Sequence, residues 1–574
     1  MSQPNRLPTG GHIDRETLVD FVFNGRSYTG HPGDTVASAL LANSVRVVGR
    51  SFKYHRPRGI FGLGAEEPNA LLQLETGART LPNHQATRVE LYHGLRANSV
   101  NCWPNPDYDL MSIIGLFHRL TPAGFYYKTF MWPPSFWRYY EYFIRRAAGL
   151  GKAPTEPDPD QYDKMNAYAD VVIVGAGPAG LAAAHSAGLS GARVIIADDQ
   201  VEPGGWLLNE RYEIDDKPAK DWVDKVIKEL TEIEEVTVLK RTTAFGLYDH
   251  NFLGMIEQRG PKLSDGEGRT RQRIWRVRAQ QVILATGAIE RPMIFSNNDR
   301  PGVMLASAVR AYANRYGVAA GQRVAIFTNN DDAFRTAIDL ADVGVEVASI
   351  IDVRPDPSGT LVTEAIRRDI EILESSVVTD VHGTKGVKSI EVGKLNDDGN
   401  AITGMQRTIN CDVICSSGGW NPAIHLHSHS GGKTNFDDTR GIFLPEKNKP
   451  NQISIGSAAG TFSLAECLAE GVSFGKNAAA ASGFKKSSRR KLPSSSLEDD
   501  NPAKILWVSP RIPSDNFKGK FFVDPAHDVT DEDIRLAARE GYESVEHAKR
   551  YTTLGMAPDQ GKTGNIPGMA ILGD

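Results

Sequence analysis

The chain has 574 residues, of which 40% are hydrophobic and 24% charged, with a formal net charge of −5 at pH 7. This length exceeds what one hydrophobic core supports, so we expect roughly three or four domains of ordinary globular composition. The mild acidity argues against nucleic acid as the main partner. The sequence has neither an apolar run of membrane-spanning length nor a signal-peptide core, which predicts a cytoplasmic protein without a membrane segment.

The four cysteines are Cys102, Cys411, Cys415 and Cys467. Their spacing matches neither a disulfide framework nor a zinc site, so we expect no bound metal. Cys411 and Cys415 lie in an apolar stretch, which is typical of buried thiols.

Residues 1–100 have the pattern of a small β-rich module. Residues 18–23 alternate between apolar and polar like a strand, and Asn24-Gly25 is the dipeptide typical of a hairpin turn. Residues 35–42 have the spacing of an amphipathic helix.

Residues 101–165 form an aromatic-rich connector, with dense aromatic runs at 125–132 and 137–143. So much aromatic surface indicates a contact between domains or subunits, internal core, or a segment on a membrane surface. We favour a contact or core over a membrane surface, because a dense basic amphipathic face is missing.

Residues 171–180 carry the strongest signal in the chain. Four β-branched residues predict a buried strand, and the glycine-rich turn Gly175-Ala-Gly177-Pro-Ala-Gly180 leads into a helix whose positive end faces a pyrophosphate. Residues 192–197 predict the second strand, which ends at Asp198 about 20 residues beyond the glycines, where an acid binds the ribose hydroxyls. Strand, glycines, helix, strand and acid in this order predict a dinucleotide site.

The carboxylate of Asp198 would repel a 2′-phosphate, so NAD or FAD fits better than NADP, and the glycine pattern by itself leaves NAD and FAD open. Ala244 is expected at the end of the next strand, where its backbone meets the adenine. Residues 453–461 form a closing turn that feeds a helix at 464–471. The predicted cofactor-binding residues are Gly175, Gly177, Ala179, Gly180, Asp198, Asp199, Gln200, Gly205, Ala244, Ala459, Gly460 and Leu464.

The first Rossmann lobe is expected over residues 166–300, completed by 453–484, and a second Rossmann-like lobe over 301–452. Residues 412–420 and 453–461 are both expected to return the chain to the first lobe. In the second lobe, residues 328–332 have two acids and no glycine where the phosphate loop would lie. We therefore expect this lobe to keep the shape without a full nucleotide site.

Residues 485–504 combine basic, serine-rich and acidic runs and are interpreted as a solvated linker, and 505–574 as a small helical module. Gln560, Lys562 and Thr563 lie on a glycine-punctuated loop near the end of the chain. They are candidates for an FMN phosphate or an interface, and a simple surface turn explains them equally well. No hydrolytic triad or metal site stands out, so no catalytic residue is assigned; His185 is best explained as a structural histidine.

The order of lobes resembles the two-dinucleotide-binding flavoprotein architecture. Over nearly its whole length the chain also resembles the α subunits of heterotetrameric sarcosine oxidase. The strings that carry this resemblance are residues 50–59, 66–71, 99–104, 124–132 and 549–562. The resemblance implies an α/β fold of two Rossmann lobes, flanked by a ferredoxin-like module and a small C-terminal helical module, both without cluster ligands.

The absence of cluster cysteines favours a resemblance to the sarcosine oxidase subunits over one to the related subunits that bind iron–sulfur clusters. Related opine-oxidase subunits carry iron–sulfur thiolates in both flanking modules, and such clusters require these ligands. Here the corresponding positions hold other residues, namely Phe61, Glu66, Asn69 and Leu81 in the N-terminal module and Asp524, Ala526, Asp559 and Gly564 in the C-terminal one.

The resemblance implies a cofactor-binding subunit of a complex that oxidises sarcosine to glycine, formaldehyde or methylene-tetrahydrofolate, and hydrogen peroxide. It implies NAD in this chain, FMN at the interface with a β subunit, FAD in the β subunit, and partners of the β, γ and δ type. The family's α subunits continue into a folate-binding domain and this sequence ends at Asp574, so tetrahydrofolate is expected only if a separate chain supplies that domain.

Two alternatives remain open. One is a subunit of an opine, N-methyl-amino-acid or proline dehydrogenase complex, because a partner subunit would set the substrate. The other is a structural NAD-binding subunit without redox turnover. A stand-alone NADH-dependent disulfide reductase is disfavoured, because no Cys-x-x-Cys pair follows the first lobe.

Overall fold

The computed structural model describes residues 3–129, 131–260, 270–485, 492–495, 501, 503–512 and 519–574. The chain folds into two compact units, each assembled from segments far apart in the sequence. Unit 1 contains Met1–Asp158, Glu290–Gly419 and Asp500–Asp574, and unit 2 contains Pro159–Ile289 and Trp420–Asp499. Most of the linker predicted at 485–504 lies outside the described residues.

A seven-stranded sheet forms the centre of unit 2, in the order β12-β9-β8-β15-β14-β13, with β28 paired to the end of β15. Its strands are β8 (Gln161–Val174), β9 (Val194–Ala197), β12 (Val236–Leu239), β13 (Thr242–Tyr248), β14 (Phe252–Gln258), β15 (Thr270–Leu284) and β28 (Gln452–Ser454). β12, β9, β8, β15 and β28 pair in parallel, and β13 and β14 add an antiparallel hairpin. This arrangement confirms the Rossmann-type fold predicted for the first lobe.

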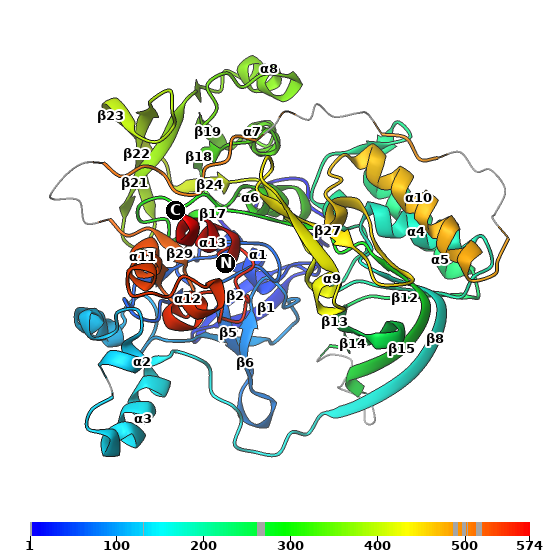
Figure 1. The fold of residues 1–574 in the computed structure, drawn as a ribbon, viewed down its shortest axis with the longest axis horizontal. Coiled ribbons are helices and arrows are strands. Elements are labelled where there is room, and N and C mark those ends of the chain that lie inside the picture. Colours follow the sequence, from blue (N-terminus) through cyan, green and yellow to red (C-terminus); the bar gives the residue numbers. More distant parts are fainter. Residues whose placement is uncertain are drawn as a thin grey trace. The chain divides into compact units, whose positions relative to one another are not determined.

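Helices α4 (Pro178–Gly188), α5 (Ala219–Glu232) and α10 (Leu464–Ala481) belong to the same unit, and α4 and α10 lie side by side (Figure 1). Two glycines of α10 permit this close packing. A Cβ atom on Gly471 would lie 2.3 Å from the carbonyl oxygen of Ala179, and one on Gly475 would lie 2.3 Å from that of Ala183. Any larger residue there would push the two helices apart.

Short elements complete the segments around this sheet. They are η4 (Gly205–Leu208), β10 (Glu213–Ile214), β11 (Lys217–Pro218), η5 (Asp249–Asn251), β16 (Ala288–Glu290), β25 (Trp420–Pro422), α9 (His425–His429), β26 (Lys433–Asp437), β27 (Ile442–Lys447) and η7 (Gly456–Ala459).

The second lobe belongs to unit 1 and contains a parallel sheet in the order β17-β24-β18-β19-β20, beside the antiparallel sheet β21-β22-β23. Its strands are β17 (Val303–Leu305), β18 (Arg323–Thr328), β19 (Glu346–Asp352), β20 (Ile372–Leu373), β21 (Ser376–Gly383), β22 (Val387–Leu395), β23 (Ile402–Asn410) and β24 (Val413–Ser417). Its helices are α6 (Ala306–Tyr316), α7 (Asp332–Asp342) and α8 (Thr360–Arg367).

The course of the chain after residue 410 differs from our expectation. We expected 412–420 to return to the first lobe and 301–452 to form the second. In the structure β24 pairs with β17 and β18, so it is a central strand of the second lobe. The chain enters unit 2 at Trp420, and residues 420–452 belong there. The apolar run at 413–415 fits a buried parallel strand in either sheet, so sequence alone did not choose between them.

The N-terminal module is a five-stranded sheet in the order β2-β1-β7-β5-β6 with one buried helix, α1 (Val36–Ala42). Its elements are β1 (Val19–Phe23), β2 (Arg26–Gly30), β3 (Gly49–Arg50), β4 (Pro57–Arg58), β5 (Leu71–Leu74), η1 (Gly77–Arg79), β6 (Leu81–Gln85) and β7 (Arg96–Ser99). Thr35 caps α1: its hydroxyl accepts from the Ser38 N–H, and the Ser38 hydroxyl accepts from the Thr35 N–H.

The aromatic-rich connector forms short helical elements with much exposed apolar surface. They are η2 (Leu110–Leu120), α2 (Phe125–Lys128), η3 (Pro134–Phe136) and α3 (Trp137–Ala147). Large exposed side chains here include Leu116, Trp132, Tyr139 and Phe143. The internal-core interpretation is therefore wrong for these residues, and the interpretation as a contact surface stays open.

In the C-terminal module two of the three helices, α11 and α13, contact a small hairpin, and α12 packs on α11 (Figure 1). Its elements are β29 (Phe522–Asp524), β30 (Val529–Thr530), α11 (Asp531–Arg539), α12 (Val545–Thr552) and α13 (Asn565–Gly573). Thr530 caps α11 through a reciprocal pair with Asp533, so the sequence defines the start of this helix locally.

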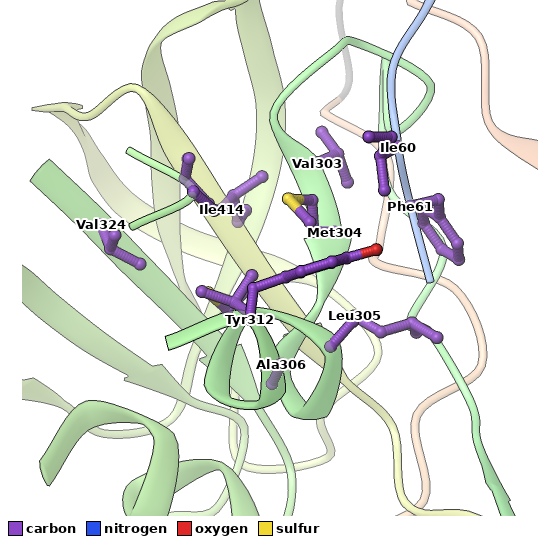
Figure 2. Packing of buried hydrophobic residues seen from close by; sticks show 14 of the residues in the cluster. Ile60, Phe61, Val303, Met304, Leu305, Ala306, Tyr312, Val324 and Ile414 are labelled. Carbon is purple, nitrogen blue, oxygen red and sulfur yellow. The ribbon is translucent and has the colours of Figure 1, made fainter. Parts of the chain in front are cut away.

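One apolar core joins the N-terminal module to the second lobe. Figure 2 shows Ile60 and Phe61 of the N-terminal module against β17 and α6, with Tyr312 extending toward them. The amide of Leu305 donates to the carbonyl oxygen of Phe61 (2.9 Å), so a backbone bond accompanies the apolar contact.

A buried guanidinium connects three segments of unit 1. Arg58 of the N-terminal module pairs with Asp299, which precedes the second lobe, and with Asp528 of the C-terminal module. The side chain of Arg58 is 2% exposed and both carboxylates are fully buried. Asp528 also accepts from the backbone amides of Lys53 (2.7 Å) and Tyr54 (3.0 Å). Arg58 lies over the ring of Phe522, 4.9 Å from its centroid.

We predict that Arg58→Met destabilises unit 1 by about 3–5 kcal/mol, because it removes the cation shared by two buried carboxylates and leaves Asp299 with Arg56 as its only remaining ion-pair partner among the described residues. Urea unfolding followed by tryptophan fluorescence measures the change. The control is Arg407→Met, which removes an exposed pair with Glu371 and should cost less than about 1 kcal/mol. Equal losses for the two variants would contradict the role given to Arg58.

Candidate functional site

The glycine turn after β8 has the geometry that a bound pyrophosphate requires. Gly175 has φ of +100°, and a Cβ there would lie 2.1 Å from the carbonyl oxygen of Ala285. A Cβ on Gly180 would lie 1.9 Å from the carbonyl oxygen of Gly175, so only glycine fits at both positions. A Cβ on Gly177 would meet nothing within 4 Å. The backbone at Gly177 is therefore open to an approaching group, at the N-terminal end of α4.

The acid at the end of β9 lies against this turn. Val174 of β8 is in register with Ala197 of β9, and the Gly175 amide donates to the Ala197 carbonyl oxygen (2.8 Å). The buried carboxylate of Asp198 accepts from the amide of Ala176 through Oδ2 (2.6 Å) and from the amide of Gln200 through Oδ1 (2.8 Å). Asp198 thus holds the glycine turn at Ala176 and the loop at Gln200. The contact with the ribose hydroxyls that we predict for Asp198 would be additional to these bonds.

The predicted residue Gly205 also lies at the turn. The Gly204 amide donates to the Ala176 carbonyl oxygen (2.8 Å), and a Cβ on Gly205 would lie 2.9 Å from Cα of Gly177. The next residue, Trp206, meets Trp420 edge to face with ring centroids 4.9 Å apart. Sequence reasoning did not find this aromatic pair, because its members are separated by more than 200 residues.

The closing turn lies against the start of α4. A Cβ on Gly456 would come within 2.9 Å of Cβ of Ala179, which brings η7 to the predicted pyrophosphate helix. Ala459 is the last residue of η7, Gly460 follows with φ of +88°, and Leu464 begins α10. Glu470 fixes the turn by accepting from the Gly456 amide (2.7 Å) and the Thr461 hydroxyl (2.7 Å).

The other three predicted residues are Asp199, Gln200 and Ala244. Asp199 is exposed and Gln200 partly buried, in the loop that Asp198 holds. Our placement of Ala244 at the end of a strand is wrong: β12 ends at Leu239, and Ala244 is the third residue of β13. The first residue of β13, Thr242, donates its amide to the Asp198 carbonyl oxygen (2.7 Å), so β13 starts beside the site.

The corresponding edge of the second lobe is filled by its own polar side chains. Asp331 pairs with Arg354 (2.6 Å), and Asp332 pairs with the fully buried Arg310 (3.1 Å). Asn329 donates to the Lys504 carbonyl oxygen (2.9 Å). These contacts occupy the positions where a phosphate loop would need exposed backbone amides.

The C-terminal candidates make contacts within their own loop. Gln560 donates to the carbonyl oxygen of Ala557 (2.8 Å), Lys562 donates to that of Asp559 (3.1 Å), and Thr563 is buried. Asp559 itself is buried, and its Oδ2 accepts from the Gly561 amide (3.1 Å). Burial and the nearby Asp524 raise the pKa of Asp559 to about 7, and Lys562 acts against the rise.

The histidine that we interpreted as structural has an acidic partner: Nε2 of His185 lies 2.6 Å from Oε2 of Glu229. Among the described residues, no three His, Cys, Asp or Glu side chains are grouped to hold a metal ion. Within the same residues, no helix has the length and apolarity needed to cross a membrane.

Three family models match the chain. Residues 16–102 match a 2Fe-2S iron-sulfur cluster binding domain, and residues 518–574 match the sarcosine oxidase A3 domain. The pyridine nucleotide-disulphide oxidoreductase model matches residues 169–459, just over half of the chain.

Two relatives are similar over nearly the whole chain. The sarcosine oxidase subunit alpha of Rhizobium meliloti (strain 1021) is 45% identical over 99% of this chain and 56% of its own length. The subunit of the same name from Corynebacterium sp. (strain U-96) is 38% identical over 100% of this chain and 55% of its own length. The chain therefore spans about half the length of these relatives.

A solved structure shares the fold. L-proline dehydrogenase from P. horikoshii superposes with a TM-score of 0.64 at 20% identity, covering 98% of this chain and 93% of that one. This likeness supports the fold predicted for the chain, with its Rossmann lobes and flanking modules.

A 2Fe-2S cluster does not fit the N-terminal module, although the matching model is named for one. Such a cluster requires several thiolates, and Cys102 is the only cysteine between residues 16 and 102. Burial and the carboxylate of Asp109 raise the pKa of Cys102 to about 12, so it remains a thiol near neutral pH.

We predict that Asp198→Asn weakens dinucleotide binding about 10-fold or more, because the charged acceptor that holds both loops becomes a neutral amide. Isothermal titration with the dinucleotide measures the dissociation constant, and circular dichroism checks the fold. Asp224→Asn is the matched control, since Asp224 is exposed on α5 and is not a predicted cofactor-binding residue. An unchanged dissociation constant in Asp198→Asn would contradict the assignment of Asp198 to the dinucleotide site.

We predict that the C-terminal module loses stability as pH rises from about 4 to about 7. The pKa of Asp559 is raised from 3.8 to about 7, so the folded state binds more protons than the unfolded chain across this interval. Asp559→Asn should flatten the dependence and be more stable than the unsubstituted protein at pH 8. Thermal unfolding at several pH values tests this, with the exposed Glu543→Gln as control; an unchanged slope in Asp559→Asn would refute it.

Proposed function

The chain belongs to the pyridine nucleotide-disulphide oxidoreductase family, and we propose that it is the dinucleotide-binding subunit of a sarcosine oxidase complex. The observation that carries the proposal is similarity to sarcosine oxidase α subunits along nearly all 574 residues, combined with an intact glycine turn and acid in unit 2. The proposed reaction is oxidative demethylation of sarcosine to glycine, with formaldehyde or methylene-tetrahydrofolate and hydrogen peroxide as the other products.

We propose NAD as the ligand of unit 2. Asp198 is buried beside the glycine turn, where a carboxylate favours free ribose hydroxyls and disfavours a 2′-phosphate. Gly175, Gly177 and Gly180 supply the close backbone approach for the pyrophosphate, and Gly205 lies against the same turn. Bound NAD supplies a nicotinamide that can exchange hydride, whereas FAD would supply a flavin. The chain's own residues bind and orient the common adenosine diphosphate portion.

We propose that the complex also contains β, γ and δ type subunits, with FAD in the β subunit and FMN at its interface with this chain. Gln560, Lys562 and Thr563 stay candidates for that interface, because they lie on a loop of the module that matches the sarcosine oxidase A3 domain. We propose that tetrahydrofolate takes part in the reaction only if the complex contains an aminomethyltransferase-like domain. The proposed location of the complex is the cytoplasm.

The exposed aromatic connector supports a protein partner. Trp132 is 81% exposed, and Tyr139, Tyr142 and Phe143 of α3 are also largely exposed, with Arg138 on the same helix. Aromatic residues and arginine dominate the energetics of protein interfaces, whereas large exposed apolar patches are uncommon on monomers. We propose that a partner subunit covers this surface.

One alternative is a subunit of a proline dehydrogenase complex, since L-proline dehydrogenase from P. horikoshii shares the fold over 98% of this chain. At 20% identity this match supports the fold alone. Opine and N-methyl-amino-acid dehydrogenase complexes, and a structural NAD-binding subunit without redox turnover, are the remaining alternatives.

The deciding experiment purifies the chain alone and with a candidate β subunit, and identifies acid-released ligands by mass spectrometry. We expect NAD in the chain alone, and flavin only when the partner is present. Sarcosine should then be oxidised with oxygen consumption by the complex but not by either chain.

FAD in the isolated chain would instead favour the dehydrogenase alternative. A Trp132→Ser/Phe143→Ser variant should lose the partner and flavin while keeping NAD, which separates the interface from the dinucleotide site. A variant that still assembles would contradict the proposed interface and leave the assignment of NAD unaffected.

A further inference from the structure

The N-terminal module matches a cluster-binding domain but lacks the ligands, so another group must organise its cluster loop. This loop comprises residues 61–70, between β4 and β5. Loops of this kind direct several backbone N–H groups inward, and such groups cannot remain buried without acceptors. The cluster loop is nevertheless largely buried in this protein.

The acceptor is the carboxylate of Glu67, which is 0% exposed. Its Oε2 accepts from the amides of Phe61 (2.7 Å) and Gly62 (2.7 Å). Its Oε1 accepts from the amides of Asn69 (2.7 Å) and Ala70 (2.9 Å). One side chain therefore satisfies four backbone donors from both ends of the cluster loop.

Two of these four donors, Phe61 and Asn69, lie in the segment that matches the 2Fe-2S cluster binding domain, at positions that the resemblance assigns to cluster thiolates. The anion that binds the backbone amides of the loop is thus a side chain of this protein. We propose that Glu67 is an internal anion that takes the place of the iron–sulfur cluster, filling an anion-binding cradle formed by the amides of Phe61, Gly62, Asn69 and Ala70. Without Glu67, this cradle would be a binding site for a small carboxylate such as acetate.

Neighbouring contacts form a second layer around the cradle. Glu66 accepts from the amides of Leu63 (2.6 Å) and Gly64 (2.8 Å) at the outer side of the loop. Gln85 donates to the carbonyl oxygens of Ala65 (3.0 Å) and Glu67 (2.9 Å), which holds the loop on β6. Glu66 is more exposed than Glu67, so it serves as an internal comparison.

The cradle is also connected to the second lobe. The Tyr312 hydroxyl donates to the Gly62 carbonyl oxygen (3.0 Å), and the Leu305 amide donates to that of Phe61 (2.9 Å). Figure 2 shows Tyr312 extending from α6 toward Phe61 and Ile60. The backbone N–H groups of Gly62 and Phe61 thus donate to Glu67, while their carbonyl oxygens accept from the second lobe. The cradle therefore fixes the contact between the N-terminal module and the second lobe.

The electrostatics fit a carboxylate held by N–H dipoles. Burial raises the pKa of Glu67 to about 7, and the four N–H bonds act against this rise. Each carboxylate oxygen of Glu67 already accepts two N–H bonds. A proton on either oxygen would therefore point at a backbone N–H group. The experiment is therefore carried out at pH 8, where the carboxylate is ionised.

Chemical rescue on the full chain tests the proposal. Glu67→Ala removes Cγ and the carboxylate, which are the atoms of an acetate ion. We expect a melting temperature several degrees below that of the unsubstituted protein, and partial recovery in sodium acetate relative to sodium chloride at equal concentration. Neither the unsubstituted protein nor Glu66→Ala should be stabilised by acetate in this comparison. Rescue that is absent, or equal in all three proteins, would overturn the proposal.

A conservative variant keeps the test informative if Glu67→Ala does not fold. Glu67→Gln retains the shape but presents an NH₂ group to two of the four donors. Hydrogen exchange at Phe61, Gly62, Asn69 and Ala70 should accelerate about 10-fold or more, whereas Glu66→Gln should leave these amides unchanged. Unchanged protection in Glu67→Gln, or stoichiometric iron and acid-labile sulfide in the purified protein, would show that Glu67 does not replace a cluster.

Discussion

The shared ion pair of Arg58 with Asp299 and Asp528 is the constraint on which unit 1 depends. A single guanidinium, 2% exposed, meets carboxylates from two segments that lie more than 200 residues further along the chain. Because a buried charge without a partner is costly, this network forms only when the N-terminal module, the start of the second lobe and the C-terminal module are all in place. The stacking of Arg56 and Arg58 over Phe522 adds apolar contact to the same junction. The flanking modules are therefore integral parts of one unit.

Carboxylates that accept backbone N–H groups organise several loops of this protein. Glu67 gathers the cluster loop, Asp198 holds the nucleotide turn, and Glu470 fixes the closing turn. In the C-terminal module Asp524 accepts from the amides of Ala526 (3.0 Å) and Gly555 (2.8 Å). An ionised acceptor bonds more strongly to an N–H than a neutral one does. Acidic side chains thus organise these loops by accepting from their backbone N–H groups.

The two units differ in the surfaces that they present to ligands and partners. Unit 2 keeps an open glycine turn with a buried acid beside it, whereas the second lobe in unit 1 closes the equivalent edge with its own ion pairs. Unit 1 instead carries an exposed aromatic surface on the connector. This division supports a subunit that binds a dinucleotide in one unit and presents the other to partners. The chain spans about half the length of its sarcosine oxidase relatives, so the reaction and its partners are proposed from this division and the similarity.

The sequence by itself determined the local features: the glycine turn, the acid after the second strand and the hairpin at Asn24-Gly25. Each depends on residues close together in the chain, so spacing and residue type are sufficient. The tertiary structure decided which sheet received β24, that the connector is exposed, and that Glu67 rather than a ligand fills the cluster loop. These outcomes depend on pairing between distant segments, and an apolar strand or a buried acid fits several partners until the whole chain has folded. A pair of glutamates at 66–67 does not reveal which one is buried, because only the surrounding backbone amides decide that.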